Sequence, residues 1–416
     1  MQRYDTLYRL YEEFPADTLR AYQDFVELFP PVASRVALEH WEEASDELDR
    51  RKEAIERAFP DGETFAEIAA RATREQAFTA LDLHSKYGRA VNVLVLDVDE
   101  TLRSAGNTDN EIPRETLSLL TTFHEAGVPI VICTGQTLEN VKGFMIQGLG
   151  SEIVHSGELS IVYEAGTGVF TPGHGADTKH LLYEDLDGEI VSIFDSLRSR
   201  VLREAPEELR RNCHLQGNEF NVTMKPNFEI GSKRAIETID EALVYELDLL
   251  GEAVGEEADA NVTSKEAGAF ARAFYAESDP EIREVLDDAG GTELPDIDDV
   301  PDPLDAVFER IDVAYYEGDA AEIGSLELNK VVGVEAAFDV LDVAEPFALV
   351  MGDSKSDLRV MEWVTEEGYG LGAAPEHSSS DVLAFVESTD ELVFDRGRSA
   401  DMLRTVYALD RLASLD

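Results

Sequence analysis

The spacing of apolar residues changes character along the chain, and the first ninety residues have a helical pattern. Two single prolines and the pair Pro30-Pro31 interrupt this pattern, as at the ends of helices. The stretches with apolar residues at helical spacing are 4–14, 17–29, 32–59 and 65–87. We expect a helical extension over residues 1–90. It could act as a dimerisation or substrate-covering module, but packing against the next domain is the simpler expectation, since we find no group of catalytic residues in it.

The pattern changes at Val91, where a short and almost wholly apolar run begins. Residues 91–96 are β-branched or leucine apart from one Asn, as in a strand buried on both faces of a parallel sheet. Further elements are expected as helices at 113–126, 138–149, 330–341, 357–364 and 400–412, and as strands at 128–133, 347–351, 368–371 and 391–394. This alternation predicts an α/β protein with a doubly wound parallel sheet.

The middle of the chain lacks this alternation. Strand-like and helical pieces mix between residues 166 and 322, which predicts an inserted α+β cap domain. Within it, residues 251–305 are dense in Asp, Glu, Gly and Pro, and we expect a solvated, partly mobile loop there. The expected parts are therefore the extension (1–90), the first part of the core (91–165), the cap (166–322) and the second part of the core (323–416).

Composition adds a strong acidic bias. The 416 residues include 87 Asp and Glu against 35 Lys and Arg, so the formal net charge is −52, while 44% of residues are hydrophobic. That apolar share is typical of a globular protein, and the lack of cations argues against nucleic acid or an anionic membrane as the main partner. The acids are spread along the chain, which suggests a salt-adapted surface from a halophilic organism. An acidic mesophilic protein is the alternative.

Two observations concern the compartment. The two cysteines, Cys133 and Cys213, exclude a disulfide framework. The chain has no run of about 18 apolar residues, and its first residues contain no apolar signal core. We therefore expect a cytoplasmic protein without a membrane span.

The first candidate chemical group follows the strand at 91–96. Asp97 and Asp99 stand two residues apart in the segment Asp-Val-Asp-Glu-Thr. Catalytic groups of open α/β sheets gather beyond the carboxyl ends of the strands. The two carboxylates could share a divalent cation there, or act as nucleophile and acid/base. The simpler alternative is that they end a strand and cap a helix.

A second acidic pair occurs near the end of the chain. Asp353 and Asp357 are four residues apart, directly after the expected strand at 347–351. This spacing puts both carboxylates on one side of a helix start, facing the edge of the sheet. Oxygen ligands of this kind suit Mg²⁺, although two helix-capping acids would look the same.

Two weaker signals lie between these pairs. Thr134 and Gly135 follow the expected strand at 128–133, where a hydroxyl and a glycine turn can hold a phosphate oxygen. Lys330 stands at the start of an expected helix. Lysine is usually solvated surface, but it is scarce in this chain, and this one falls in the stretch where the alternation resumes.

In this order, the four signals resemble those of the haloacid dehalogenase (HAD) superfamily of phosphohydrolases. That family carries Asp-x-Asp-x-Thr, then Thr or Ser, then Lys, then Gly-Asp-x-x-x-Asp, and the resemblance covers residues 91–416. About 195 residues separate Thr134 from Lys330. A large cap at this position resembles the Cof-type and sugar-phosphatase branch. The chain departs from the family pattern at Gln136, where Arg is frequent, and at Ser356, where Asn is frequent.

The resemblance implies a mechanism through an aspartyl-phosphate. Asp97 would be the nucleophile and Asp99 the acid and base, while Thr134, Gly135 and Lys330 would bind the phosphoryl group. Mg²⁺ would be held by the Asp97 carboxylate, the Asp99 main-chain carbonyl and Asp353, with Asp357 as a direct or indirect ligand. The substrate would be a small phosphorylated metabolite of the sugar phosphate or phosphoglycolate type. Further polar residues that could reach it, but are as readily plain surface, are His155, Asn218, Asn221, Lys225 and Lys355.

Other readings remain open from the sequence. A phosphotransferase could use the same residues, and a non-catalytic binding or assembly protein could use the N-terminal helices as its working surface. These helices could also join copies of the chain into a homo-oligomer. A phosphonate hydrolase of the superfamily would need a lysine in a small cap after the first motif, and residues 103–112 contain none.

Overall fold

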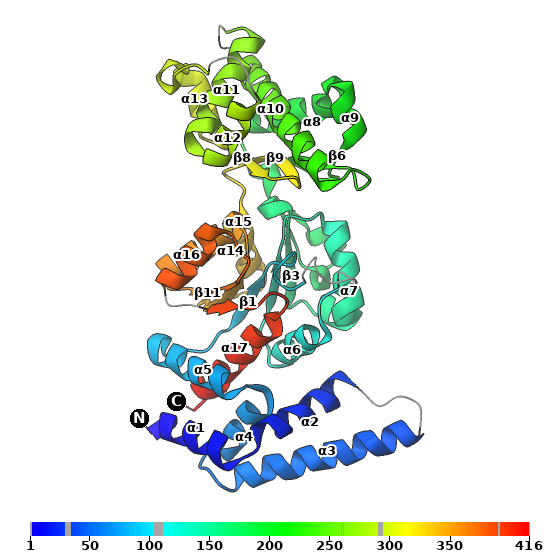
Figure 1. The fold of residues 1–416 in the computed structure, drawn as a ribbon, viewed down its shortest axis with the longest axis vertical. Helices are drawn as coiled ribbons and strands as arrows, with labels where there is room; N and C mark the ends of the chain where they lie inside the picture. The colour runs from blue at the N-terminus through cyan, green and yellow to red at the C-terminus, as the bar shows by residue number, and fades with distance from the viewer. Residues whose placement is uncertain are drawn as a thin grey trace.

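The computed structural model describes residues 2–29, 35–103, 111–258, 260, 262–289, 294–389 and 392–415. Along its long axis the molecule has a cap at one end, an α/β core in the middle and the N-terminal helices at the other end (Figure 1). The strands of the core sheet are β1 (Val93–Leu96), β2 (Ile130–Cys133), β3 (Leu159–Tyr163), β4 (Gly168–Phe170), β5 (His180–Leu181), β10 (Ala348–Met351), β11 (Gly370–Pro375) and β12 (Leu392–Phe394).

The core sheet is mostly parallel, and its strand order reverses beside β1. The order is β12-β11-β10-β1-β2-β3-β4-β5, and the six strands from β12 to β3 are parallel. The chain adds β2 and β3 on one side of β1, and later β10, β11 and β12 on the other side. Ligands of such sheets bind beyond the carboxyl ends of the strands at this reversal. The antiparallel strands β4 and β5 extend this sheet, although we expected residues 166–181 in the cap.

Helices cover both faces of this sheet, as expected for a doubly wound fold. The core helices are α6 (Arg114–Glu125), α7 (Leu138–Val154), α14 (Lys330–Val340), α15 (Lys355–Glu366), α16 (Ser380–Ser388) and α17 (Ser399–Ala413). Successive strand residues face opposite sides. Leu94 and Leu96 therefore share an apolar cluster with α6, α7 and α17, whereas Val93 and Val95 share another with α14, α15 and α16.

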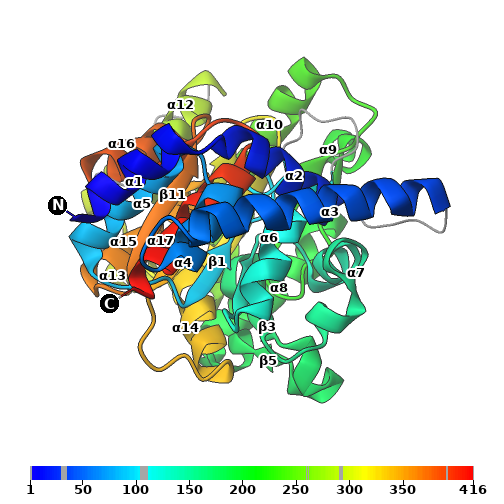
Figure 2. The same ribbon diagram turned by 90° about the horizontal axis from the view of Figure 1, so that it is seen from below.

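The N-terminal helices belong to the first of these two clusters. They are α1 (Gln2–Glu13), α2 (Ala16–Leu28), α3 (Arg35–Glu56), α4 (Gly62–Arg71) and α5 (Arg74–Tyr87). The α4 and α5 helices pack on α17, where Arg71 lies over the ring of Tyr407 at 4.9 Å. A capping box at Thr73 starts α5, so the helix expected over 65–87 is two helices. Figure 2 shows α2 and α3 lying across the base of the core. Packing against the core is confirmed, and oligomerisation through these helices stays a prediction.

The cap has its own sheet and its own apolar core. Its elements are α8 (Gly188–Glu204), α9 (Glu207–Asn212), β6 (Cys213–Leu215), β7 (Val222–Pro226), α10 (Ser232–Glu257), α11 (Ser264–Ser278), α12 (Pro280–Asp288), α13 (Asp302–Phe308), β8 (Ile311–Tyr316) and β9 (Ala320–Ser325). The strands form an antiparallel sheet in the order β6-β7-β9-β8. Helices α8, α10 and α13 pack against one face of this sheet. The cap is therefore an α+β unit, as predicted.

Short 3₁₀ helices occur in the connections. They are η1 (Glu164–Gly166), η2 (Pro172–His174), η3 (Ala176–Thr178), η4 (Leu182–Asp185) and η5 (Ile297–Asp299). Over the described ranges, no helix combines the length and apolar composition that a membrane crossing requires.

The expectation of a loop over 251–305 is wrong for the described part of that segment. Three helices, α11, α12 and α13, occupy much of it. Ala271 and Tyr275 of this segment are buried in the cap core, and the Tyr275 hydroxyl lies within hydrogen-bond distance of the Phe308 and Ile311 carbonyls. The high density of acidic residues concealed an amphipathic pattern, because only one face of each helix carries the apolar residues.

The cap core contains one carboxylate without a hydrogen-bond partner. Glu246 lies on α10 and is fully buried, and neither of its carboxylate oxygens has a partner in the described part of the chain. Burial raises the pKa of Glu246 well above its usual range, and the negative charge of Glu322 adds to this effect. The folded cap therefore favours the protonated form of Glu246.

We predict that Glu246→Met stabilises the protein at neutral pH by about 1–3 kcal/mol, since an unpartnered polar group leaves the core. Because the folded pKa is raised, the folded state holds more protons than the unfolded state above the unfolded pKa of Glu246. The free energy of unfolding of the wild type, relative to that of the variant, should therefore fall as the pH rises above the unfolded pKa of Glu246. Chemical denaturation of both proteins from pH 5 to pH 8 measures this difference in the free energy of unfolding. Glu246→Gln should also remove the pH dependence, and a pH-independent difference would contradict the prediction.

Candidate active site

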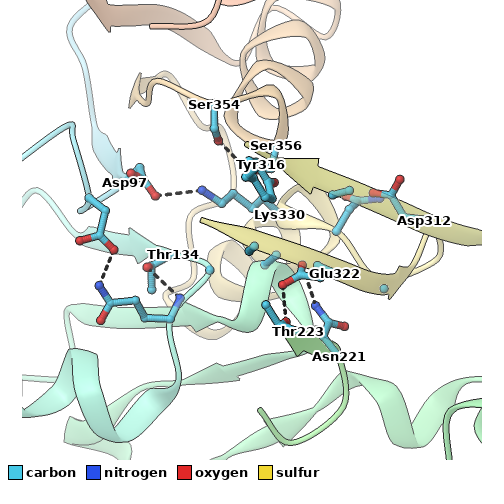
Figure 3. Close-up of a pocket in the computed structure, with 18 of the residues that line it drawn as sticks. Asp97, Thr134, Asn221, Thr223, Asp312, Tyr316, Glu322, Lys330, Ser354 and Ser356 are labelled. Atoms are coloured by element: carbon cyan, nitrogen blue, oxygen red, sulfur yellow. Dashed lines mark hydrogen bonds and ion pairs between the residues drawn. The ribbon is translucent and has the colours of Figure 1, made fainter. Parts of the chain in front are cut away.

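The predicted site residues meet at the point where the strand order reverses. Asp97 follows β1, and its main-chain N–H donates to the Met351 carbonyl of β10 at 2.9 Å. Thr134 follows β2, and Asp353 follows β10. These three residues, with Gly135 and Lys330, line one cavity of about 260 Å³ between the core and the cap. Figure 3 shows Asp97, Thr134 and Lys330 on the core side of this cavity.

Lys330 occupies the centre of this arrangement. It is the first residue of α14, and the side chain of Asn329 caps that helix by accepting two main-chain N–H groups. The Lys330 ammonium donates to Asp97 Oδ1 at 2.9 Å and to Asp357 Oδ1 at 2.6 Å, and only 3% of its side chain is exposed. Burial by itself lowers the pKa of Lys330, but the two carboxylates outweigh burial and raise it well above its usual range. The ammonium therefore stays charged.

The carboxylates around Lys330 hold more negative charge than one ammonium neutralises. Oxygen atoms of Asp97, Asp353 and Asp357 all lie within 4.8 Å of one another. Burial raises the pKa of Asp97 well above its usual range despite Lys330, and burial together with the charge of Asp357 raises the pKa of Asp353 to about 7. Three carboxylates and one ammonium leave two negative charges when all are ionised. Both that charge and the oxygen ligands fit a divalent cation such as Mg²⁺.

Asp357 both caps a helix and contacts Lys330. Its Oδ2 accepts hydrogen bonds from the main-chain N–H and the hydroxyl of Ser354, which closes a capping box at the start of α15. Its Oδ1 accepts from Lys330. A Cβ atom on Gly352 would lie 2.3 Å from Asp357 Cβ, so only glycine lets this side chain come so close. Both oxygens of Asp357 are thus engaged by the protein itself.

Asp99 lies apart from these carboxylates. About half of its side chain is exposed, and it lines the cavity. Arg103 donates to its Oδ1 from Nε at 2.9 Å, and the Gln136 amide donates to its Oδ2. The Gln136 main-chain N–H donates to the Thr134 hydroxyl at 3.1 Å. Gln136, where the family pattern often has Arg, thus orients Asp99, a role that its position in the sequence did not reveal.

The structure shows which of the five further polar residues considered from the sequence line the cavity and which do not. Asn221 and Lys225 line the cavity from the cap, whereas Asn218 is not a lining residue and its amide donates to the Thr223 hydroxyl at 2.8 Å. His155 and Lys355 are not among the lining residues, and Lys355 pairs with Glu281 of α12. Sequence reasoning missed further residues of the cap that line the cavity, which include Thr223, Asp312, Tyr316 and Glu322.

A buried carboxylate joins the cap to the core beside this cavity. Glu164 follows β3, and its carboxylate accepts the main-chain N–H groups of Glu219 at 2.6 Å and of Phe220 at 3.2 Å. Its own N–H donates to the Gln136 carbonyl at 2.9 Å. Glu164 is 1% exposed and has a φ of 48°, an uncommon conformation for a residue other than glycine. It therefore holds a cap loop against the loop that carries Thr134 and Gln136.

We predict that Glu164→Gln loosens this joint, because an amide nitrogen replaces one oxygen acceptor next to the N–H groups of Glu219 and Phe220. The expected cost is about 1.4 kcal/mol, equivalent to roughly tenfold faster hydrogen exchange at these two amides. Exchange measured by NMR or mass spectrometry tests it, with β1 amides as the internal reference. The exposed Glu184→Gln is the matched control, and unchanged exchange at Glu219 and Phe220 would refute the role of Glu164.

Comparisons with known proteins give only distant similarity. No model of a protein family matches the chain, and no curated protein matches it. Among solved structures, the chain is similar to trehalose-6-phosphate phosphatase of Aspergillus fumigatus, with 13% identity, a TM-score of 0.42, and 82% of this chain and 99% of that one covered. It is also similar to a haloacid dehalogenase-like hydrolase from Bacteroides thetaiotaomicron, with 12% identity, a TM-score of 0.41, and coverage of 76% and 98%.

A third similar structure is a subclass IIB sugar phosphatase of the HAD superfamily, with 15% identity, a TM-score of 0.41, and coverage of 76% and 97%. Since identities and TM-scores are this low, the function of the chain has to be inferred from the site itself.

Proposed function

We propose that the protein is a Mg²⁺-dependent phosphohydrolase of the haloacid dehalogenase type, which cleaves a small phosphorylated metabolite through an aspartyl-phosphate. The observation that carries this proposal is the buried Asp97 carboxylate beside the Lys330 ammonium, at the strand-order reversal and under the cap. A nucleophile, a phosphate-binding cation and a set of carboxylate oxygens for a metal converge there.

In the first half of the proposed reaction, the Asp97 carboxylate attacks the phosphorus atom of the substrate. A bond forms between Asp97 oxygen and phosphorus, and the bond from phosphorus to the ester oxygen breaks. Asp99 gives its proton to the departing oxygen, so the alcohol leaves neutral. Arg103 and Gln136 hold the Asp99 carboxyl group in place through this step.

In the second half, Asp99 takes a proton from water. The resulting hydroxide bonds to phosphorus, the bond to Asp97 breaks, and inorganic phosphate leaves with both active-site carboxyl groups restored. The Thr134 hydroxyl and the Lys330 ammonium hold the phosphoryl oxygens in both halves, where negative charge develops. The cap excludes bulk water from the cavity during these steps.

The residues present fit Mg²⁺. Asp97 and Asp353 would hold it, with the main-chain carbonyl of Asp99, and Asp357 would support the site through Lys330 because both its oxygens are engaged. When bound, the ion supplies positive charge that offsets the repulsion between Asp97 and the phosphoryl group.

We predict that Asp97→Asn lowers kcat for an aryl phosphate such as p-nitrophenyl phosphate by at least about 10³-fold, because an amide cannot act as the nucleophile. Release of nitrophenol in Mg²⁺ and molar KCl measures this. The exposed Asp339→Asn on α14 should keep wild-type activity. Normal turnover by Asp97→Asn would show that the nucleophile is another group.

A second prediction tests the metal without measuring activity. Mg²⁺ at a hundred times its Kd should stabilise the wild type by about 2.7 kcal/mol, seen as a higher Tm, and Asp353→Asn should lose this effect. Without Mg²⁺, Asp353→Asn should be at least as stable as the wild type above pH 7, since the substitution removes one of the crowded negative charges. An equal Mg²⁺ shift in both proteins would exclude Asp353 as a ligand.

A further inference from the structure

The cap sheet turns one face toward its own helices and the other toward the cavity. On β9, Ala321 and Ile323 point into the cap core, so the alternate residues face the cavity. The cavity-facing residues of the sheet include Asn221, Thr223 and Lys225 around β7, Glu322 on β9, and Asp312 and Ala314 on β8. This face forms the wall opposite Asp97 and Lys330 (Figure 3).

Glu322 lies at the centre of this face with small neighbours around it. The strand register places it between Ala314 of β8 and Thr223 of β7, and Ala320 and Gly324 precede and follow it on its own strand. Cross-strand neighbours on one face are close enough to touch, so the short side chains of Ala314 and Ala320 leave space beside the Glu322 carboxylate, whereas the Asn221 amide packs over Gly324. The cavity thus has a hollow with a carboxylate on its floor.

Thr223 and Asn221 already donate hydrogen bonds to Glu322. What this part of the cavity offers a ligand is therefore acceptor oxygens rather than donors. Glu322 Oε2 accepts from the Thr223 hydroxyl at 2.6 Å, and Oε1 accepts from the Asn221 amide at 3.4 Å. The Thr223 hydroxyl hydrogen is therefore already used. Asn221 is 4% exposed, and its Oδ1 has no hydrogen-bond partner among the described residues. That oxygen is enclosed by the surrounding protein atoms, so the acceptors within reach of a ligand in the cavity are those of Glu322.

The cationic side chains of the cavity wall are all paired with carboxylates. Among the described residues that line it, the cations are Lys225, Lys330 and Arg359. Lys225 pairs with Asp319 at 3.1 Å, and Arg359 of the core pairs with Asp312 of the cap at 3.1 Å. Lys330 is held by Asp97 and Asp357. The cap side of the cavity therefore offers no surplus positive charge to a second anionic group on a substrate.

We propose that the cap face selects phosphate esters of neutral, polyhydroxylated alcohols and rejects esters whose alcohol part carries a second negative charge, with Glu322 as the specificity-determining residue. This proposal rests on the proposed phosphohydrolase function. Substrate hydroxyls donate to the Glu322 carboxylate, whereas a carboxylate has no hydrogen to donate and is repelled by Glu322. Of the two substrate types that the sequence suggested, the structure thus favours the sugar phosphate over phosphoglycolate.

Matched substrate pairs test this selectivity in the wild type. Glucose 6-phosphate is compared with 6-phosphogluconate, and glycerol 1-phosphate with phosphoglycolate, in Mg²⁺ and molar KCl. We expect kcat/KM at least tenfold higher for the neutral member of each pair. Equal kcat/KM values within the pairs, or higher values for the acidic members, would overturn the proposal. Hydrolysis of an aryl phosphate in the same assay would show that the phosphohydrolase function nevertheless holds. If no ester is hydrolysed at all, including the aryl phosphate, the proposed function fails instead.

The role of Glu322 is tested by Glu322→Gln, which keeps the shape of the side chain and removes its charge. The ratio of kcat/KM between neutral and acidic substrates should fall about tenfold, and this ratio is independent of the fraction of active enzyme. Glu237→Gln on α10, outside the cavity, is the matched control and should keep the wild-type ratio. An unchanged ratio in Glu322→Gln would overturn the assignment.

Two further measurements need no variant. Free glucose should inhibit aryl phosphate hydrolysis by the wild type more strongly than free gluconate, and the reverse order would contradict the proposal. Glucosamine 6-phosphate carries an ammonium group in place of one hydroxyl of glucose 6-phosphate. It therefore tests whether the acceptor oxygens of the cap recognise hydroxyl groups or a cation. A kcat/KM for it more than tenfold above that of glucose 6-phosphate would show that the acceptors select an ammonium group, and would overturn the choice of neutral alcohols.

Discussion

The buried ion pairs of Lys330 with Asp97 and Asp357 are the interaction on which the rest of the structure depends. Removing three charges from water is favourable only when their geometry is satisfied, and loss of one partner leaves an uncompensated buried charge. Asp97 follows β1, Lys330 begins α14, and Asp357 lies in the first turn of α15. The pairs therefore form only when the chain has crossed to the cap and returned, and when β10 lies beside β1.

The acidic residues at this site differ from those at the surface in their burial and in the cations that balance their charge. Many cations at the surface are shared among several carboxylates; Arg310, for example, pairs with Asp187, Glu189 and Glu327. Such exposed pairs contribute little to stability and are screened by salt. At the site, Asp97 and Asp357 are buried and Asp353 is half-buried, and their charge is balanced by a single ammonium and, in our proposal, by a divalent cation. Because the other cations of the cavity wall are already paired, a bound phosphoryl group depends on these two positive charges.

Contacts between the cap and the core lie on several sides of the cavity. Glu164 binds the cap loop at Glu219, Arg359 pairs with Asp312, and Gln216 donates to the Gly135 carbonyl at 3.4 Å. The cap residues that line the cavity are thus held by the same loops that carry Thr134 and Gly135. This connection explains how a cap that supplies no reacting group in our mechanism can still control which ester reaches Asp97.

The sequence alone predicted the fold class, and it singled out several of the residues that the structure brings to one cavity. Apolar runs at residues 91–96 and 347–351 indicate buried parallel strands, and Asp97 and Asp353 follow directly after them, so local order already places both at one sheet edge. The departures at Gln136 and Ser356 were visible, but the contact of Gln136 with Asp99 was not, because the two residues are 37 positions apart in the chain.

The tertiary structure decided the roles of residues whose partners are distant in the chain. Glu164 and Glu322 are two of 87 acidic residues, and no local pattern distinguishes them from solvated surface. Only the pairing of β7, β9 and β8 places Glu322 at the centre of the cap face, and only the return of the cap loop gives Glu164 its N–H donors. The helices within 251–305 were missed because their acidic outer faces dominate the composition. A local pattern records which side chains can be buried, whereas strand register and long-range contacts determine which partner each buried group meets.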